Sequence, residues 1–267
     1  MFSVVSGIAI YAMACFPLAW AWQTILVSLH GERRRPDRLL MTYARSQMGK
    51  YIPGNVAHIA GRHIAASGHG YSNSALIFST VYEMSGLLSA AGLVSSVALL
   101  FSGAAILEQF PHIVAVPLLA FVLPIFYLAH RLAPRISGKS HVGEPVGSGS
   151  APALLFLPYI HYLLFFLLAG GALVLLTTQT GTTLNTQAYM VIGLAFATSW
   201  TLGFLTPGAP SGIGVREAVL VFILSPLLGS AQAIVVSVLF RVVTVGGDLL
   251  FWLLMEARGR YRSEALC

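Results

Sequence analysis

Six ionisable side chains lie within or beside strongly apolar stretches of the sequence, namely Arg62, Glu83, Arg216, Glu217, Arg241 and Asp248. A charge inside a bilayer is costly unless it is paired or hydrated, so residues of this kind are candidates for a functional site. Their spacing and their neighbours indicate which chemistry they could perform.

Two of the arginines follow similar breaks in the apolar pattern. Residues 53–62 read PGNVAHIAGR and residues 207–216 read PGAPSGIGVR, so each stretch has Pro-Gly, seven residues and then Arg. Proline and clustered glycines end a helix, which then restarts. Free backbone N–H groups, the positive end of the helix dipole and a guanidinium meet at such a restart, and this combination suits a phosphate.

The predicted head-group site therefore consists of Arg62, Arg216, Gly54, Gly208, Ser211, Gly212 and Gly214. Its glycines would allow the backbone to approach a ligand closely. The alternative is a helix break with an arginine that extends toward the interface. The pattern also lacks the GxxxxGK[ST] sequence of a nucleotide-binding P-loop.

A second pair of segments matches downstream, since residues 79–83 align with residues 237–241, with four more intervening residues in the second half. Two matches in order indicate an internal duplication, and paired helix breaks point to the binding site of a transporter. Glu83 and Arg241 are equivalent in this alignment. We expect them to form an ion pair at mid-membrane, with a purely structural role as the alternative.

Two acidic residues complete the predicted set of intramembrane charges. Glu217 either neutralises Arg216 when no ligand is bound or stabilises the helix N-terminus. Asp248 lies in the last apolar run and is grouped with Glu83, Arg241 and Glu217 as a charge-pairing or gating residue.

Catalytic and metal-binding patterns are missing from the sequence. The eight histidines show no metal spacing, because His58 and His63 are five residues apart without an HExxH motif. No GxSxG motif and no carboxylate pair at hydrolase spacing occurs. We expect no catalytic residues, no metal and no cofactor.

The composition indicates an all-α polytopic membrane protein. Hydrophobic residues make up 57% of the chain and charged residues 9%, whereas roughly a quarter of the residues of a soluble domain are charged. A chain of 267 residues can build one compact membrane domain at about 20 residues per span. The net charge of +6 reflects basic loops in such a protein, so we expect no nucleic-acid partner.

The predicted spans are residues 2–29, 75–102, 112–130, 152–178 and 231–255. Residues 39–70 and 187–229 resemble re-entrant hairpins with broken helices. Residues 131–150 form a Gly/Ser/Pro-rich linker between a first half (1–130) and a second half (151–267). No charged residue precedes Glu32, so a basic signal-peptide region is missing and we expect the first helix to be retained.

Charge placement predicts the orientation of these segments. Thirteen of the fifteen Lys and Arg residues fall in residues 30–70, 131–141 and 258–262. If every span crosses once and each hairpin returns to its own side, all three clusters lie on one face, which the positive-inside rule makes cytoplasmic. The two hairpins then enter from opposite faces, as in an inverted repeat, and the C-terminus is cytoplasmic.

Three motifs resemble those of the lysylphosphatidylglycerol synthase transmembrane (flippase-like, UPF0104) family: GKYIPG at residues 49–54 with Arg62, TPGAPSGIGVREA at residues 206–218, and LFRVVT at residues 239–244. The resemblance covers nearly the whole chain and implies a lipid flippase-type domain, with Arg62, Glu83, Arg216, Glu217 and Arg241 at the family's polar positions. The family's soluble synthase domain is absent here. The amino end is about one helix shorter than in full-length relatives, which implies a start further upstream.

The sequence thus favours a translocator of anionic, phosphate-bearing lipids in the cell membrane, including aminoacylated or polyprenyl-linked lipids. The alternatives are a non-transporting scaffold for a lipid-modifying or glycosyltransferase partner, and an intramembrane enzyme acting on a lipid phosphate with Glu83 or Glu217 as base. The expected partners are membrane lipids and a lipid-modifying enzyme. A homodimer is expected by analogy alone.

Overall fold

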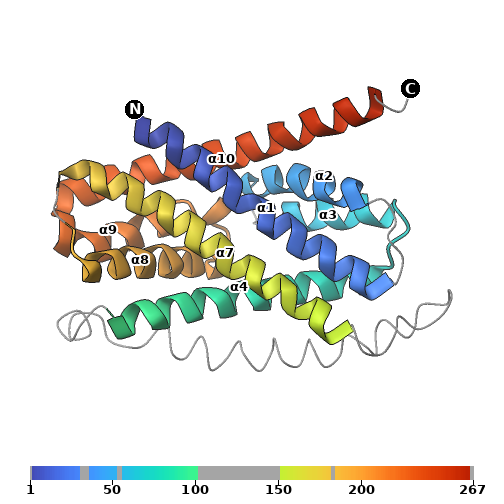
Figure 1. Cartoon of the computed structure of the whole chain (residues 1–267), viewed down its shortest axis with the longest axis horizontal. Helices are drawn as coiled ribbons and strands as arrows, with labels where there is room; N and C mark the ends of the chain where they lie inside the picture. Colours follow the sequence, from blue (N-terminus) through green and yellow to red (C-terminus); the bar gives the residue numbers. More distant parts are fainter. Residues whose placement is uncertain (1, 31–35, 53–55, 102–150, 182–183, 265–267) are drawn as a thin grey trace.

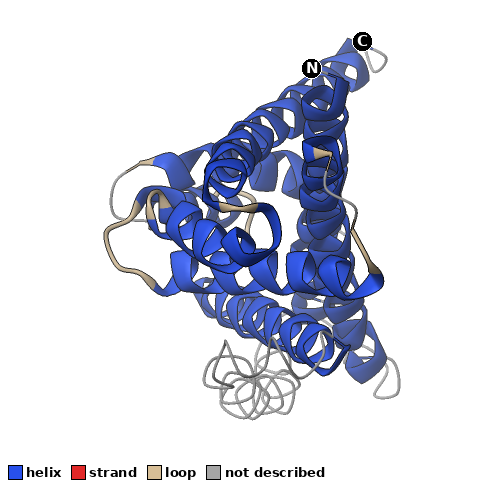
Figure 2. Cartoon of the chain, turned by 90° about the vertical axis from the view of Figure 1, so that its left-hand side faces the viewer, coloured by secondary structure: helices blue, strands red, loops and turns tan. Residues whose placement is uncertain are grey.

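Every regular element in the described part of the chain is helical. The computed structural model describes residues 2–30, 36–52, 56–101, 151–181 and 184–264. The elements are α1 (Phe2–His30), α2 (Pro36–Gln47), η1 (Met48–Tyr51), α3 (Ala57–Ser67), α4 (Asn73–Phe101), α7 (Ala151–Thr177), η2 (Thr178–Thr180), α8 (Thr186–Leu205), η3 (Pro210–Gly212), α9 (Val215–Leu228) and α10 (Ser230–Glu264). Figure 2 shows the bundle from its left-hand end in Figure 1.

Six described segments are long and apolar enough to cross a membrane: Phe2–Leu29, Asn73–Leu99, Phe156–Thr180, Thr186–Leu205, Pro210–Leu228 and Ser230–Gly259. The chain is therefore a multi-pass membrane protein, and four of the five predicted spans are confirmed as helices. The fifth predicted span (112–130) and the linker (131–150) lie outside the described residues.

Two helical hairpins enter the bundle from opposite ends of its long axis (Figure 1). Helices α2 and α3 pack together at one end and α8 and α9 at the other, and the breaks meet where η1 contacts η3. Helices α2 and α3 have 12 and 11 residues, so each is about 17 to 18 Å long, little more than half of a bilayer core of about 30 Å. Both predicted hairpins are present as pairs of helices with a break between them, and the limbs of the first are too short to cross. The inverted repeat stays a prediction.

The second hairpin differs from the first in length. Its limbs, Thr186–Leu205 and Pro210–Leu228, have 20 and 19 residues, so each is long enough to cross by itself. The sequence analysis predicted a re-entrant hairpin for residues 187–229 because a Pro/Gly-rich break separates its two limbs. The structure shows limbs longer than a re-entrant hairpin requires.

Small residues bring the longest helices into close contact. Helix α1 packs against both α7 and α10, and a Cβ atom placed on Gly247 of α10 would lie 2.8 Å from Tyr11 Cδ1 and 3.0 Å from the backbone nitrogen of Ala12. Small residues of this kind let helix backbones approach each other in membranes, where packing rather than hydrophobicity drives helix association. Tyr11 then makes edge contacts with Phe165 and Phe240 in the bundle core.

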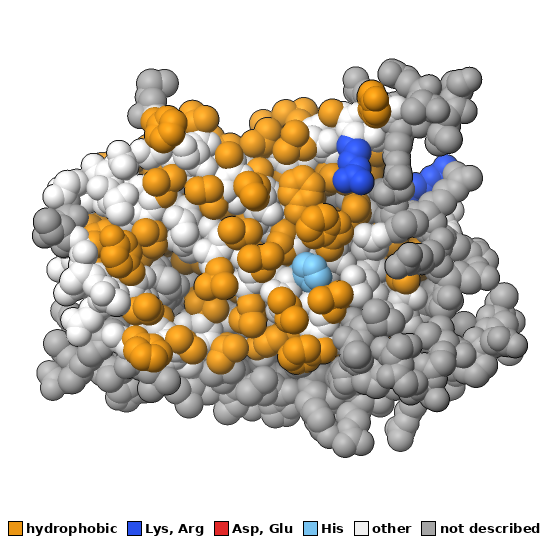
Figure 3. All heavy atoms as spheres, viewed as in Figure 1, with side chains coloured by type: hydrophobic (Ala, Val, Ile, Leu, Met, Phe, Trp, Pro, Cys, Tyr) orange, Lys and Arg blue, Asp and Glu red, His pale blue; other side chains and the backbone are white. Residues whose placement is uncertain are grey.

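The outer surface of the bundle is apolar. Figure 3 shows hydrophobic side chains spread across the middle of the visible face and Lys or Arg side chains toward its right-hand end. The exposed apolar residues include Phe156, Leu167, Phe222, Val235 and Leu253. Helices α1 and α10 both end at the right-hand end in Figure 1, so the basic residues 258–262 in the last turns of α10 lie at the end of the bundle where α1 also ends. The third basic cluster, 131–141, lies outside the described residues.

We predict that Gly247→Ala lowers the thermal unfolding temperature of the detergent-solubilised protein. The added methyl group would clash with Tyr11 and the α1 backbone, and overpacking of this kind costs about 1–3 kcal/mol. Gly171→Ala in α7 is the control, since a Cβ atom there meets nothing within 4 Å and alanine favours the helix. Equal unfolding temperatures for Gly247→Ala and wild type would contradict the close α1–α10 contact.

Candidate functional site

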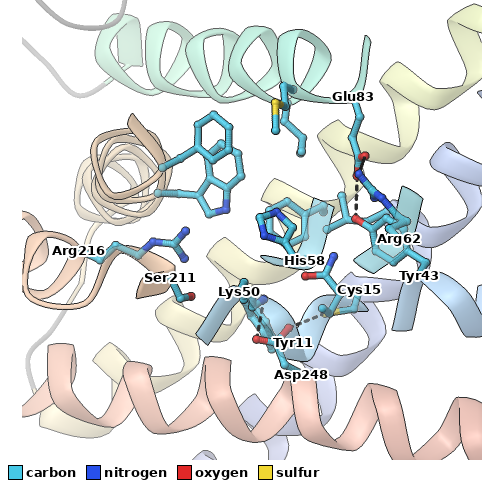
Figure 4. A pocket seen from close by; sticks show the side chains of 17 residues that line it. Tyr11, Cys15, Tyr43, Lys50, His58, Arg62, Glu83, Ser211, Arg216 and Asp248 are labelled. Carbon is cyan, nitrogen blue, oxygen red and sulfur yellow. Dashed lines mark hydrogen bonds and ion pairs between the residues drawn. The ribbon is translucent and has the colours of Figure 1, made fainter. Parts of the chain in front are cut away.

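A cavity of about 90 Å³ lies where the two hairpin breaks meet (Figure 4). Its charged lining residues are Lys50, Arg62, Glu83, Arg216 and Asp248. Its other polar lining residues include Tyr11, Cys15, Tyr43, Gln47, His58 and Ser211. The rest of the lining is apolar and consists of Leu18, Met84, Leu87, Phe165, Trp200 and Phe204. A space of this size has room for several water molecules beside the polar groups. The structure thus brings charged groups from both halves of the chain to one polar site inside an apolar bundle.

Arg62 of α3 is neutralised inside the protein. Its Nη2 lies 2.5 Å from Glu83 Oε2, and its Nη1 donates to Glu83 Oε1 at 3.1 Å. The Tyr43 hydroxyl donates to the same carboxylate at 2.8 Å. The guanidinium carbon lies 4.8 Å from the centre of the Trp22 ring and 4.9 Å from that of Tyr43. Arg62 and Glu83 are 3% and 4% exposed, so this arginine is part of a closed pair.

Asp248 of α10 holds the first hairpin break. Lys50 Nζ lies 2.7 Å from Asp248 Oδ2, and the Tyr51 hydroxyl donates to the same oxygen at 2.5 Å. The Cys15 thiol of α1 donates to Oδ1 with a sulfur–oxygen distance of 3.6 Å. Asp248 is 1% exposed, so three donors from two other elements replace water around a buried carboxylate.

Arg241 of α10 holds the second break. Its Nη1 donates to the Ser211 carbonyl at 3.1 Å, and its Nε lies 3.5 Å from Glu217 Oε1. The other Glu217 oxygen, Oε2, accepts the Gly214 N–H at 2.6 Å. Gly214 has φ 85°, a conformation that favours glycine. Glu217 therefore caps α9, as one of the two sequence hypotheses stated, and its ionic partner is Arg241 instead of Arg216.

The predicted ion pair between Glu83 and Arg241 is wrong. Glu83 pairs with Arg62, and Arg241 pairs with Glu217. In both cases a charge on the second helix of a hairpin binds the opposite charge on the long helix that follows, with the signs exchanged between the two halves. Glu83 and Arg241 are thus equivalent in their own halves, since each pairs with the second helix of its hairpin. Equivalent positions in an alignment need not be in contact.

Arg216 is the cation that differs from the others. It forms no ion pair among the described residues, whereas Lys50, Arg62 and Arg241 each form one. Its buried Nε has no hydrogen-bond partner there, as is also true of Arg62 Nε and Arg241 Nη2, so the missing ion pair is what distinguishes Arg216. Its guanidinium carbon lies 5.9 Å from the centre of the Trp200 ring, and Figure 4 shows the side chain reaching into the cavity. The site therefore contains one positive charge that the described protein groups do not neutralise.

Two glycines make room for Arg216. A Cβ atom on Gly203 would lie 2.5 Å from Arg216 Cγ, and one on Gly212 would lie 2.8 Å from Arg216 Nε. Gly212 thus gives space to the arginine, whereas the sequence pattern suggested space for a ligand. Gly208 has φ 81°, and a Cβ atom placed on it would meet nothing within 4 Å, which fits a turn residue. Gly54 lies outside the described residues.

Sequence reasoning missed several members of the site. Lys50 and Tyr51 lie within the quoted GKYIPG motif, so the motif carried the signal, but no charge pattern connected them to Asp248. Tyr43 and Gly203 had no distinguishing signal, because a lone tyrosine or glycine in a helix usually serves packing. Their roles depend on contacts between segments that are far apart in the chain.

His58 of α3 lines the same cavity. Within the described ranges, no three His, Cys, Asp or Glu side chains lie together as a metal site requires.

Comparison with known proteins adds no relative to these observations. No protein-family model, curated protein or solved structure matches the chain. The likeness to the lysylphosphatidylglycerol synthase transmembrane family therefore rests on its three sequence motifs, and the geometry of the cavity is the basis for any functional inference.

We predict that Glu83 is energetically coupled to Arg62 and not to Arg241. Removing one partner of a buried pair costs about 3–5 kcal/mol, because the other charge is left uncompensated. Glu83→Gln and Arg62→Met should each destabilise the protein, and the double variant should cost much less than their sum. The free energy of unfolding in a detergent titration measures this difference. In the matched cycle of Glu83→Gln with Arg241→Met, the two costs should add; coupling there instead would restore the original pairing hypothesis.

Proposed function

We propose that this protein moves an anionic, phosphate-bearing lipid across the membrane. The observation that supports this function best is the unneutralised guanidinium of Arg216 in a polar cavity at the meeting point of two opposed hairpins. An uncompensated charge in an apolar bundle is costly, so it is expected where a ligand supplies the missing charge.

The guanidinium is the main anion-binding group in this proposal. A planar guanidinium binds phosphate through two parallel hydrogen bonds, which gives both affinity and orientation. The N-terminus of α9 contributes less than the sequence suggested, because the Glu217 carboxylate already accepts the Gly214 N–H. Arg62 contributes mainly to the shape of the cavity, since Glu83 neutralises it.

Translocation in this scheme lowers the cost of desolvating a phosphate. A lipid head group crosses an unassisted bilayer slowly because its charge must leave water. A polar cavity between two hairpins that enter from opposite ends offers a hydrated path, while the acyl chains stay in lipid along the apolar outer surface. Exposure to the two sides would alternate as one half of the chain rocks against the other.

The proposed location is the cell membrane, with the C-terminus on the cytoplasmic side. The basic residues 258–262 lie at the end of the bundle where α1 also ends, and basic segments next to spans mark the cytoplasmic face. The first hairpin would then enter from the cytoplasm and the second from outside.

We predict that the purified protein accelerates leaflet exchange of labelled anionic phospholipids in proteoliposomes and that Arg216→Ala slows this exchange at least about tenfold. Hydrogen bonds to a charged group contribute about 1.5–3 kcal/mol, and each 1.4 kcal/mol is a factor of about ten. A quencher added outside the vesicles reports the fraction of label in the outer leaflet over time. Arg216→Lys should retain part of the activity, since it keeps the charge but not the planar fork.

Arg258→Ala is the matched control, because Arg258 is an exposed arginine near the end of α10 and does not line the cavity. It should exchange lipid at the wild-type rate. If no anionic or polyprenyl-phosphate lipid moves faster in the presence of the wild-type protein, the translocator proposal fails and the scaffold alternative takes its place. A change in the mass of the lipid would instead indicate the enzyme alternative.

A further inference from the structure

We propose that the cavity selects a phosphate monoester, which carries two negative charges, and that Lys50 is its second cationic ligand, released when Asp248 takes up a proton. This inference rests on the proposed function and specifies the head group that the same site takes. It assigns Lys50 and Asp248 a part in ligand binding beyond holding the first hairpin break.

The two residues are placed to take this part. Lys50, Asp248 and Arg216 line the same cavity, and Figure 4 shows Lys50 beside Asp248 and Arg216 reaching in from the opposite hairpin. The Lys50 side chain is 17% exposed and that of Asp248 1%. An anion bound at Arg216 is therefore in the same polar space as the lysine ammonium group.

Lys50 is easier to release than Arg62. Arg62 has two contacts with Glu83 and lies against two aromatic rings. Lys50 has one ionic contact and lies over one aromatic ring, that of Tyr51, at 5.6 Å from its centre. Its charge is a compact ammonium group on a flexible stem. A second negative charge in the cavity would consequently attract Lys50 and leave the Arg62 pair intact.

Charge counting then requires a proton. The described lining of the cavity contains three cations (Lys50, Arg62 and Arg216) and two carboxylates (Glu83 and Asp248), so its formal charge is +1. A singly charged phosphodiester balances Arg216 by itself. A dianionic monoester leaves one negative charge in excess, and one proton from water on the Asp248 carboxylate restores neutrality. Lys50 keeps its own proton and exchanges the carboxylate for the phosphate.

The surroundings of Asp248 can accommodate its neutral form. The Tyr51 hydroxyl and the Cys15 thiol still have acceptor oxygens on the protonated acid after the lysine leaves. The titratable and charged groups that face Asp248 or share its cavity are Tyr11, Cys15, Tyr43, Lys50, Tyr51, His58, Arg62, Glu83, Arg216 and, on its own helix, Arg241. When Asp248 takes up a proton, Lys50 loses its ionic partner. The phosphate of the ligand then replaces the carboxylate as the ionic partner of Lys50.

Titration calorimetry on the detergent-solubilised full chain tests this proposal, with dihexanoyl phosphatidic acid as the monoester and dihexanoyl phosphatidylglycerol as the diester. At about pH 8 the monoester is mainly a dianion, because its second pKa is about 6. Binding heats in buffers with different ionisation enthalpies give the number of protons taken up. We expect about one proton for phosphatidic acid, about none for phosphatidylglycerol, and at least about tenfold weaker binding of the diester.

Two variants extend the measurement to the residues. Asp248→Asn should bind phosphatidic acid at least as tightly as wild type, because Lys50 is already free, but without proton uptake. Lys50→Gln should reduce the affinity for phosphatidic acid to that for phosphatidylglycerol and should also abolish the uptake. The buffer comparison on the wild-type protein stands alone if a variant does not fold.

The outcomes separate this inference from the proposed function. Phosphatidic acid binding to wild type without proton uptake, or with the same affinity as the diester, overturns the role of Lys50 and Asp248. In that case, Arg216-dependent leaflet exchange would still support translocation. Failure of wild type to bind either lipid, together with no leaflet exchange, overturns both proposals.

Discussion

Helix α10 determines where the two hairpin breaks lie, because Arg241 and Asp248 are seven residues apart and so project from nearly the same face. Asp248 binds Lys50 of the first break. Arg241 binds the second break through Ser211 and Glu217. A buried charge separated from its partner is costly in an apolar bundle, so each contact resists movement of a hairpin away from α10. One helix with opposite charges at these two positions thus sets the location of the cavity.

The helices were predictable from the sequence because long apolar runs have few alternatives in a membrane, where every backbone polar group must be satisfied within the chain. Residues 75–102 and 152–178 therefore became α4 and α7 with boundaries shifted by one or two residues. The last helix extends to Glu264, beyond the predicted end at residue 255. Its polar final turns carry no apolar signal, although their Arg and Glu residues favour a helix.

The partners within the site were harder to predict, and the failure of the Glu83–Arg241 pair shows why. The alignment of the two halves relates positions by symmetry, but it does not say which symmetry-related residues approach each other. Contact instead follows chain proximity: the second helix of each hairpin packs on the long helix after it, so Arg62 meets Glu83 and Glu217 meets Arg241. The same ion-pair arrangement occurs in both halves, but the positive and negative residues are exchanged. A comparison of residue types alone therefore scores these positions as mismatches.

The surroundings of Arg216 determine its expected role, and no sequence motif predicts those surroundings. Arg62 and Arg216 have the same predicted role because both follow a Pro-Gly break. In the structure, aromatic rings and a carboxylate enclose Arg62, whereas Gly203 and Gly212 leave Arg216 a passage to the cavity. Water held by the polar groups of the cavity would hydrate a charge that is otherwise costly to bury. Arg62 stays paired with Glu83 and keeps the shape of the site, while Arg216 is available to bind and release an anion.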